Sequence, residues 1–535
     1  MNKFSQKLDN FFEISARNST IKTEIMGGLT TFFAMCYIML VNPSQMVGFL
    51  QFEGFPGAQQ VWNAVYIATA LGAIVGTLLM ALYAKMPFAQ ASGMGLNSFF
   101  FVSFMVNGFG NAVSVFAPGG DIKASFAAGL SIIFVAGLVF MFLSVTGLRK
   151  KITESLPSCL KRAIPAGIGL FIAFIGLKNA GIVQFNQYTF VQAGNWNIFN
   201  GLNGIIVPME VIDPATGELI KISGIQSVPV TWYSIAPAIA ALIGVLLIAA
   251  LSRTKLAKAN VIIGIIATTC LYYLFNIGND AAFQISMINP GDTFRDFGEL
   301  GVQGWYKGFS YWTGEAVLQA ILLVITFCLV DMFDTLGTLQ GTAAEANMLD
   351  ENGNPKNLNK CLMSDSAATV VGSMMGTSTV TTFVESAAGV SAGARTGLSS
   401  VVVAFMFFIA MFLSPLAAVI PGAATAPALI YVGVLMMKNF KEVDFSDLTT
   451  AVPAFLTLLM MPLTYSISNG IAFGMISYMA LKLFKVFFTN EIKVSEYFAI
   501  ATKKNGKTTG EFFSKDIVVF IIGALFLVRF FMVTM

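Results

Sequence analysis

Long apolar runs, separated by short polar segments, recur along almost the whole chain. Most are about as long as an α-helix must be to cross the hydrocarbon core of a bilayer. The runs predict helices at 24–45, 62–84, 88–106, 125–147, 162–180, 231–251, 258–276, 315–337, 360–376, 378–393, 397–419, 425–438, 447–463 and 467–487. The chain is therefore predicted to be an all-α polytopic membrane protein with about 14 transmembrane helices.

The two ends of the chain depart from this pattern. Residues 1–23 contain no apolar stretch of signal-peptide length, so we expect the first apolar helix to direct insertion and to stay attached. A charged stretch at 488–515 precedes a last apolar helix at 516–535, which is either an extra span or an interfacial helix. Most Lys and Arg residues fall in segments on the same side as residues 1–23, which predicts a cytoplasmic N-terminus in a multi-pass protein of the plasma (inner) membrane.

Segments on the opposite side are Gly-rich or aromatic. They include 107–120, 181–204 and 276–312. Within the external loop at 181–230, residues 207–224 alternate in polarity around a Pro-Ala-Thr-Gly turn. This alternation predicts an external β-hairpin.

Composition narrows the function classes. Hydrophobic residues make up 56% of the 535 residues and charged residues only 11%, with a mean hydropathy of +0.75. The net charge of +3 gives no reason to expect a nucleic-acid partner. The chain has no P-loop, no histidine and no cysteine cluster, so we expect neither ATP-driven transport nor a metal or other cofactor. Proton chemistry near neutral pH would then fall to carboxylates, with the proton as coupling ion.

Two predicted helices are interrupted at mid-depth. Gly93 and Gly95 break the third, and a Thr-rich, β-prone stretch before Glu385 breaks the tenth. Seven positions separate the two helices, so they cross the membrane in opposite directions, as in a 7+7 inverted repeat with broken helices. Extended backbone at membrane depth is tolerated only where protein or a water-filled cavity covers it. Two half-helices are therefore expected to begin beside one central binding site.

Three carboxylates lie inside weakly polar stretches, at Asp331, Asp334 and Glu385. A charged side chain at the bilayer centre costs about 2.5–3.5 kcal/mol on insertion scales, so such residues usually handle a ligand or a proton. Asp331 and Asp334 are three residues apart on one helical face, where both could look into one cavity and accept a proton. Two simpler interpretations stay open: one or both aspartates lie near the cytoplasmic end of their helix in contact with water, or Glu385 is an ordinary helix cap.

Uncharged residues at the first break are further candidates for ligand binding. Asn97 can donate and accept a hydrogen bond at once, as an uncharged heterocycle would require. Gly93 and Gly95 would let the backbone approach the ligand, although a packing role for the glycine pair is an equal alternative.

Hydroxyl and aromatic groups complete the candidate set. Thr30 and Thr31 lie on the first helix, which the repeat relates to the eighth, and are expected to line the same cavity unless they bond to their own helix. Ser386 follows Glu385 directly. Residues that could stack on a flat ligand are Phe88, Phe333 and Phe383.

At these residues the chain resembles the AzgA-like purine permeases, a branch of the nucleobase:cation symporter (nucleobase-ascorbate transporter) superfamily. The resemblance covers nearly the whole chain. It rests on GGLTTFFAMCYIMLVNP at 27–43, QASGMGLNSFF at 90–100, DMFDTLGTLQG at 331–341, GTSTVTTFVESAAGVSAGARTGL at 376–398 and AVPAFLTLLMMPLTYSISNGIAFG at 451–474.

The resemblance implies a fourteen-helix fold of two inverted seven-helix repeats. A core domain would comprise helices 1–4 (24–147) and 8–11 (315–419), and a gate domain helices 5–7 (162–276) and 12–14 (425–487). The core would move against the gate in alternating access, often within a homodimer in the lipid bilayer. The helix at 516–535 does not fit this count.

The resemblance also implies the cargo, which would be adenine, guanine or hypoxanthine imported with protons. Asn97, Asp331 and Glu385 would contact the purine, and Asp334 would serve coupling, with Asp331 and Glu385 as other candidates for carrying the proton. A purine is planar, nearly neutral and edged with donors and acceptors, which suits a slot holding a carboxylate, an amide and free backbone N–H groups. The preferred purine is not determined by these residues.

Other functions are less consistent with the sequence. A transporter of xanthine, uracil or another nucleobase would share the same pattern. An anion transporter would need a cation near the helix breaks, and none lies within 88–100 or 376–393. An intramembrane enzyme would need a nucleophile and base or a metal site, and a channel would show rings of repeated polar residues, so we predict neither.

Overall fold

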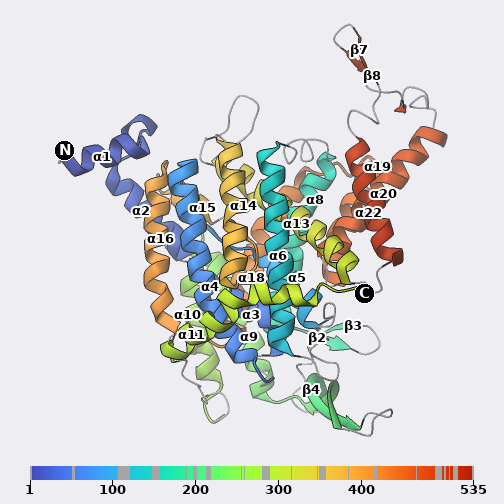
Figure 1. The fold of residues 1–535 in the computed structure, drawn as a ribbon. Coiled ribbons are helices and arrows are strands. Elements are labelled where there is room, and N and C mark those ends of the chain that lie inside the picture. The colour runs from blue at the N-terminus through green and yellow to red at the C-terminus, as the bar shows by residue number, and fades with distance from the viewer. Residues whose placement is uncertain are drawn as a thin grey trace.

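The computed structural model is a bundle of α-helices, and its described residues include four antiparallel strand pairs (Figure 1). It describes residues 3–50, 55–106, 121–147, 157–186, 190–194, 196, 202–212, 219–254, 256–257, 260–279, 283, 289–314, 316–345, 348, 357–383, 385–414, 419–464, 467–488, 497–498, 502–504, 507–509 and 516–532. Within this part of the chain, six helical stretches have the length and apolar composition of a membrane span, and five shorter apolar helices accompany them.

The main helices follow the predicted runs closely. They are α2 (Ile21–Met35), α3 (Ile38–Val47), α4 (Ala58–Leu79), α5 (Met94–Phe100), α6 (Ile122–Val145), α8 (Ser158–Asn179), α9 (Trp232–Leu251), α10 (Asn260–Phe275), α13 (Ala316–Glu345), α14 (Leu358–Met375), α15 (Ser386–Ser391), α16 (Gly397–Ala410), α18 (Gly422–Met436), α19 (Leu448–Leu463) and α20 (Ile467–Phe488). Short stretches of 3-10 or π-helix extend several of them: Gly48–Leu50, Met80–Ala84, Phe101–Val106, Met411–Leu413 and Met437–Glu442.

Three differences from the predicted helices stand out. The first predicted span is divided into α2 and α3 at Cys36 and Tyr37, and α13 continues to Glu345 rather than ending at 337. A short helix, α1 (Lys3–Phe12), and the turn Ser15–Arg17 precede the first span.

The segment at 276–312, for which the sequence predicted no helix, is partly helical. It contains α11 (Pro290–Asp296), the π-helix Phe297–Gly301, α12 (Val302–Lys307) and the 3-10 turn Gly308–Tyr311, which pack against α4 and α6. Its glycines weaken the helical signal in the sequence. Close packing explains some of them: a Cβ on Gly304 would stand 2.9 Å from Leu130 Cδ1 of α6.

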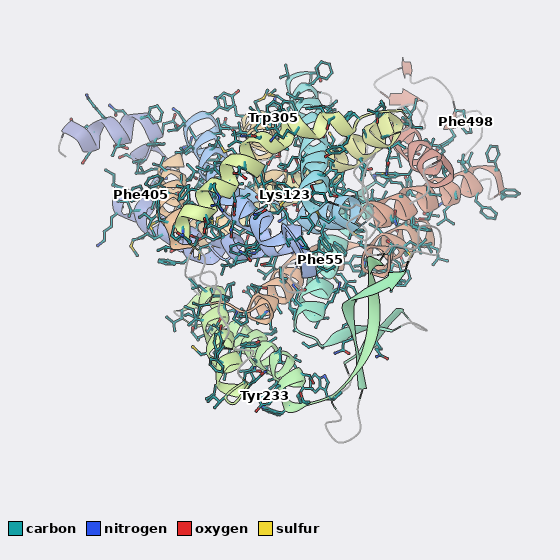
Figure 2. All side chains as sticks on the ribbon, turned by 60° about the horizontal axis from the view of Figure 1, so that its bottom comes forward. Phe55, Lys123, Tyr233, Trp305, Phe405 and Phe498 are labelled. Carbon is teal, nitrogen blue, oxygen red and sulfur yellow. The ribbon has the colours of Figure 1, made fainter. Side chains whose placement is uncertain are left out.

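The helices pack in two groups. In the first, α4 contacts α3, α14 and α16, and α6 contacts α13 and α14. In the second, α8 contacts α18 and α19, while α9 and α10 pack on each other and on α18. Contacts of α13 and α5 with α8 join the groups. Aromatic residues such as Phe405, 61% exposed, and Tyr233 lie on the outside of the bundle (Figure 2), as expected of surfaces that face lipid.

The predicted β-hairpin is confirmed. β4 (Leu202–Ile212) pairs antiparallel with β5 (Leu219–Pro229), with Val207 opposite Gly224, and the Pro-Ala-Thr-Gly turn lies outside the described residues. The hairpin and α1 lie at opposite ends of the molecule (Figure 1). Two smaller pairs are β2 (Val183–Asn186) with β3 (Phe190–Ala193), and β7 (Thr502–Lys504) with β8 (Lys507–Thr509).

The last apolar segment forms α22 (Ile517–Met532) and packs on α20. Asp516 at its start accepts a hydrogen bond from Tyr478, at 3.3 Å, and lies 3.7 Å from Lys482 Nζ. Gly523, two turns later, lies beside Met479 and Met475. The helix therefore runs back along α20, toward the N-terminal part of that helix.

Candidate functional site

The two interrupted helices meet in a short strand pair at the centre of the first group. β1 (Gln90–Ser92) precedes α5, β6 (Val380–Thr382) precedes α15, and the two strands pair antiparallel with Ala91 opposite Thr381. The Gly93 N–H donates to the Thr379 carbonyl at 2.9 Å, and the Phe383 N–H to the Ala89 carbonyl at 3.0 Å. Each extended stretch thus satisfies the backbone groups of the other, as non-helical backbone inside a membrane requires.

Buried amides and hydroxyls hold this strand pair in place. Asn42 of α3 donates to the hydroxyls of Thr69 and Thr377, at 2.6 and 2.9 Å, and Thr377 shares a hydrogen bond with Ser92 at 2.6 Å. Gln90 lies on the other side and donates to Thr382, at 3.3 Å. Buried hydrogen bonds through Asn42 and Thr377 therefore connect the strand pair to α3 and α4, and the Gln90–Thr382 bond links the two strands.

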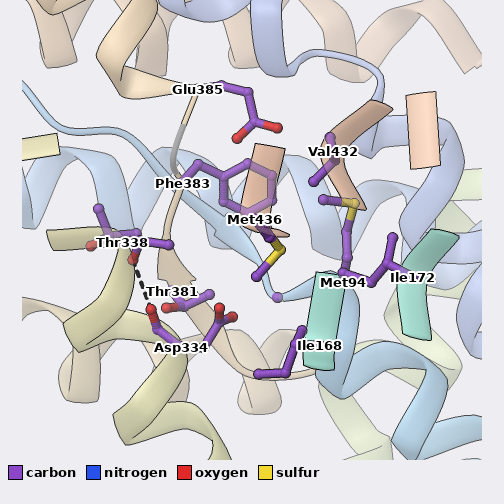
Figure 3. Close-up of a pocket in the computed structure, with 12 residues that line it drawn as sticks. Met94, Ile168, Ile172, Asp334, Thr338, Thr381, Phe383, Glu385, Val432 and Met436 are labelled. Atoms are coloured by element: carbon purple, nitrogen blue, oxygen red, sulfur yellow. Dashed lines mark hydrogen bonds between the residues drawn. The ribbon is translucent and has the colours of Figure 1, made fainter. Parts of the chain in front are cut away.

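A cavity of about 350 Å³, counting its opening, lies beside the strand pair. Figure 3 shows Glu385 and Asp334 at different ends, with Phe383 and Met436 between them. The polar lining comes from Asp334, Thr338, Thr381, Thr382 and Glu385; the remaining lining residues are Gly93, Met94, Ile168, Ile172, Phe383, Val432 and Met436. α8 and α18 contribute only apolar side chains, so every polar side chain of this lining comes from α13, β6 and the residues before α15.

Glu385 uses its two carboxylate oxygens differently. The Tyr37 hydroxyl donates to Oε1 at 2.5 Å, a short charge-assisted contact when the carboxylate is ionised. Oε2 is buried and has no hydrogen-bond partner among the described residues. Glu385 stands at the N-cap of α15, but its side chain makes no capping hydrogen bond, so the simple capping interpretation does not describe this site.

The two aspartates of α13 face different surroundings. Asp334 lines the cavity and is 9% exposed, whereas Asp331 is 1% exposed, is not among the described lining residues and accepts a hydrogen bond from Thr369 of α14 at 3.2 Å. Asp331 is shielded from water by its burial, whereas Asp334 faces a cavity with an opening, so the interpretation that one of the two contacts water stays open for Asp334. The expectation that both look into one cavity holds for Asp334 only.

At the first break, Gly93 and Asn97 have different surroundings. Gly93 lines the cavity, and a Cβ there would stand 3.0 Å from Thr381 Cγ2 and 3.6 Å from Asp334 Oδ2, so glycine permits this approach. Gly95 lies in α5, and its surroundings lie outside what the structure describes. Asn97 is fully buried: it donates to Gln45 at 3.3 Å and accepts from the Ser378 hydroxyl.

The hydroxyl candidates lie outside the described cavity lining. Thr30 donates to the Met26 carbonyl of its own helix at 2.8 Å, and Thr31 packs against Gly389 of α15. Ser386 accepts a hydrogen bond from the Ala89 N–H at 3.0 Å and so joins the two breaks. Of the stacking candidates, Phe383 lines the cavity, Phe88 is buried elsewhere, and the side chain of Phe333 lies outside the described residues.

Two residues at the site were missed in the sequence. Asp365 of α14 is fully buried and accepts hydrogen bonds from Thr335, at 2.7 Å, and Gln90, at 3.3 Å. It lies inside the apolar stretch at 360–376, so the membrane cost that singled out the other carboxylates applies to it equally. Tyr37 carried no such signal, because a tyrosine in an apolar run is common.

Comparison with known proteins gives the family. A family model described as "Permease family" matches residues 22–208 and 201–473. The chain is 38% identical to the guanine/hypoxanthine permease PbuO of Bacillus subtilis, over 88% of this chain and 94% of that protein. It is 34% identical to the adenine permease AdeQ of Escherichia coli, over 90% and 91%.

A solved structure supports the same kind of fold. The transmembrane domain of the cyanobacterial bicarbonate transporter BicA matches with a TM-score of 0.52 and 15% identity, covering 84% of this chain and 96% of that one. At this identity the match speaks for the fold alone, which is that of a polytopic membrane transporter. Together with the apolar helices and the broken-helix pair, the matches show that the chain belongs to the permease family, alongside adenine and guanine/hypoxanthine permeases.

Proposed function

We propose that this chain is a secondary active transporter that imports a purine nucleobase by proton symport, and that the cavity between Asp334 and Glu385 holds the base. The observation that carries the proposal is Glu385 Oε2, a buried carboxylate oxygen beside the cavity with no hydrogen-bond partner in the described part of the chain. An acceptor left unpaired in this way favours a ligand that brings its own N–H group.

The lining suits a purine chemically. The described lining side chains offer two carboxylates and three threonine hydroxyls at its polar edges and no cationic side chain, which disfavours an anion such as bicarbonate. The walls from α8, α18 and Phe383 are apolar, as the faces of a flat heterocycle require. Guanine, hypoxanthine and adenine all present N–H donors at their edges; xanthine and uracil are the same-fold alternatives.

The geometry favours a different division of roles between the aspartates from the one that resemblance implies. Asp334 is the α13 carboxylate beside the cavity, so we assign it to the substrate or to a proton exchanged there. Asp331 and Asn97 then act through the strand pair and its neighbours rather than by contact with the base.

The same proposal includes the architecture of transport. The first packing group would form a core domain and the second a gate domain. The whole would be a fourteen-helix arrangement of two inverted repeats, in which β1–α5 of one repeat is equivalent to β6–α15 of the other. The protein would reside in the plasma membrane with its N-terminus in the cytoplasm, and a homodimer is compatible with this arrangement.

Uptake of one radiolabelled purine, in cells that lack other purine permeases, tests the proposal. We expect saturable uptake that collapses when a protonophore dissipates the proton gradient. Competition by a panel of unlabelled guanine, hypoxanthine, adenine, xanthine and uracil identifies the cargo. Uptake that is insensitive to the protonophore would remove proton coupling, and competition by uracil alone would remove the purine assignment.

A further inference from the structure

Tyr37 lies where the first apolar helix is interrupted. α2 ends at Met35, α3 begins at Ile38, and Tyr37 is the residue before α3, with its backbone still in the helical region. Its carbonyl accepts hydrogen bonds from Leu40 and Val41, each at 3.0 Å. The side chain is 2% exposed and crosses from this interruption to Glu385, 348 positions away in the sequence.

This contact determines which oxygen of Glu385 remains for a ligand. The Tyr37 hydroxyl holds Oε1 at 2.5 Å, and Oε2 is left without a partner among the described residues. Within that part of the chain, no Lys or Arg forms an ion pair with Glu385. A carboxylate anchored through one oxygen keeps the other in a fixed direction, and the donated hydrogen bond stabilises the ionised form.

We propose that Tyr37 is a positioning residue for Glu385: its hydroxyl orients the carboxylate so that Oε2 meets the cargo, and it sets how readily that carboxylate gains and loses a proton. The inference rests on the proposed function for its transport readout. It also assigns a function to the interruption between α2 and α3, because Tyr37 lies there and positions Glu385 of the other repeat.

Tyr37→Phe removes only the hydroxyl, and Tyr66→Phe is the matched control. Tyr66 is also buried, and its hydroxyl donates to the Ala410 carbonyl at 3.0 Å, without touching Glu385. At equal membrane abundance, we expect Tyr37→Phe to raise the KM of uptake about tenfold and to move its pH profile. Tyr66→Phe should leave both unchanged.

Carbodiimide modification of Glu385, quantified by mass spectrometry, separates this inference from the proposed function. Carbodiimide reacts with a protonated carboxyl group, and loss of the hydroxyl favours that form, so modification at neutral pH should rise several-fold in Tyr37→Phe. Modification of Asp334, which the tyrosine does not contact, serves as the internal reference. The readout needs no transport: absence of purine uptake by the wild type would refute the proposed function alone.

Two results would overturn the role of Tyr37. One is a Tyr37→Phe protein whose Glu385 modification equals that of the wild type across the pH range. The other is a variant whose uptake falls only in proportion to its membrane abundance, with KM and pH profile intact, because that is the signature of a purely structural hydroxyl.

Discussion

The carboxylates beside the cavity and those behind the strand pair are all buried, but they face different surroundings. Asp334 and Glu385 border the cavity. Asp331 and Asp365 lie behind the strands and accept hydrogen bonds from threonines of neighbouring elements. The comparison teaches that membrane cost marks a carboxylate as constrained, whereas its neighbours decide whether it serves a ligand or the fold.

The largest effect is expected for Glu385→Gln, which tests whether Glu385 binds the ligand. An amide cannot supply a second ionised oxygen to the cargo, so we expect uptake to fall by more than about 100-fold. Membrane abundance, measured by immunoblot, should stay at the wild-type level. Undiminished uptake would falsify the ligand role of Glu385 and would mean that this carboxylate, like Asp331 and Asp365, serves the fold.

Asp334→Asn tests the other cavity carboxylate. We expect uptake against a gradient to drop by about 10- to 100-fold, because a group that exchanges a proton beside the cavity has been neutralised. Counterflow exchange of labelled for unlabelled base, which needs no net proton movement, should be less affected. If accumulation and exchange fall together, Asp334 binds cargo rather than coupling it to protons.

Asp365→Ala tests the structural group. Removal of this side chain leaves the Thr335 hydroxyl and the Gln90 amide without their buried acceptor, which should lower the free energy of unfolding by about 2–3 kcal/mol. Thermal unfolding in detergent measures the loss. The KM of the molecules that fold should change less than about threefold. A stable Asp365→Ala protein that no longer transports would show that Asp365 binds the ligand or carries the proton.

The smallest effect is expected for Thr30→Val. Thr30 donates to its own helix at Met26, so removal of the hydroxyl should change uptake by less than about twofold. Uptake rates measured at several base concentrations would detect a larger change. A tenfold rise in KM would show that the hydroxyl reaches the cargo in another conformation of the transporter.

Much of this site was predictable from the sequence, and the failures have physical reasons. Breaks at Gly93 and before Glu385 were predicted from residues that disfavour helix, and they appear as β1 and β6. The assignment of Asp331 to the cavity rested on spacing and on the family resemblance, and residues one turn apart can still face different neighbours. Asp365 was overlooked although the same cost argument applied to it, whereas the contact between Tyr37 and Glu385 spans 348 positions and has no local signal.

The apolar helices, the two mid-depth breaks and the family could all be predicted from the sequence. Each of these depends on local composition or on motifs, and the cost of placing polar backbone or charge in a bilayer is high enough to leave a trace in the chain. Only the tertiary structure decided which carboxylates reach the cavity, that Tyr37 holds Glu385, and that 290–311 is helical rather than a plain loop. These features depend on side chains from distant segments meeting in space, and such contacts add no periodic pattern to the sequence.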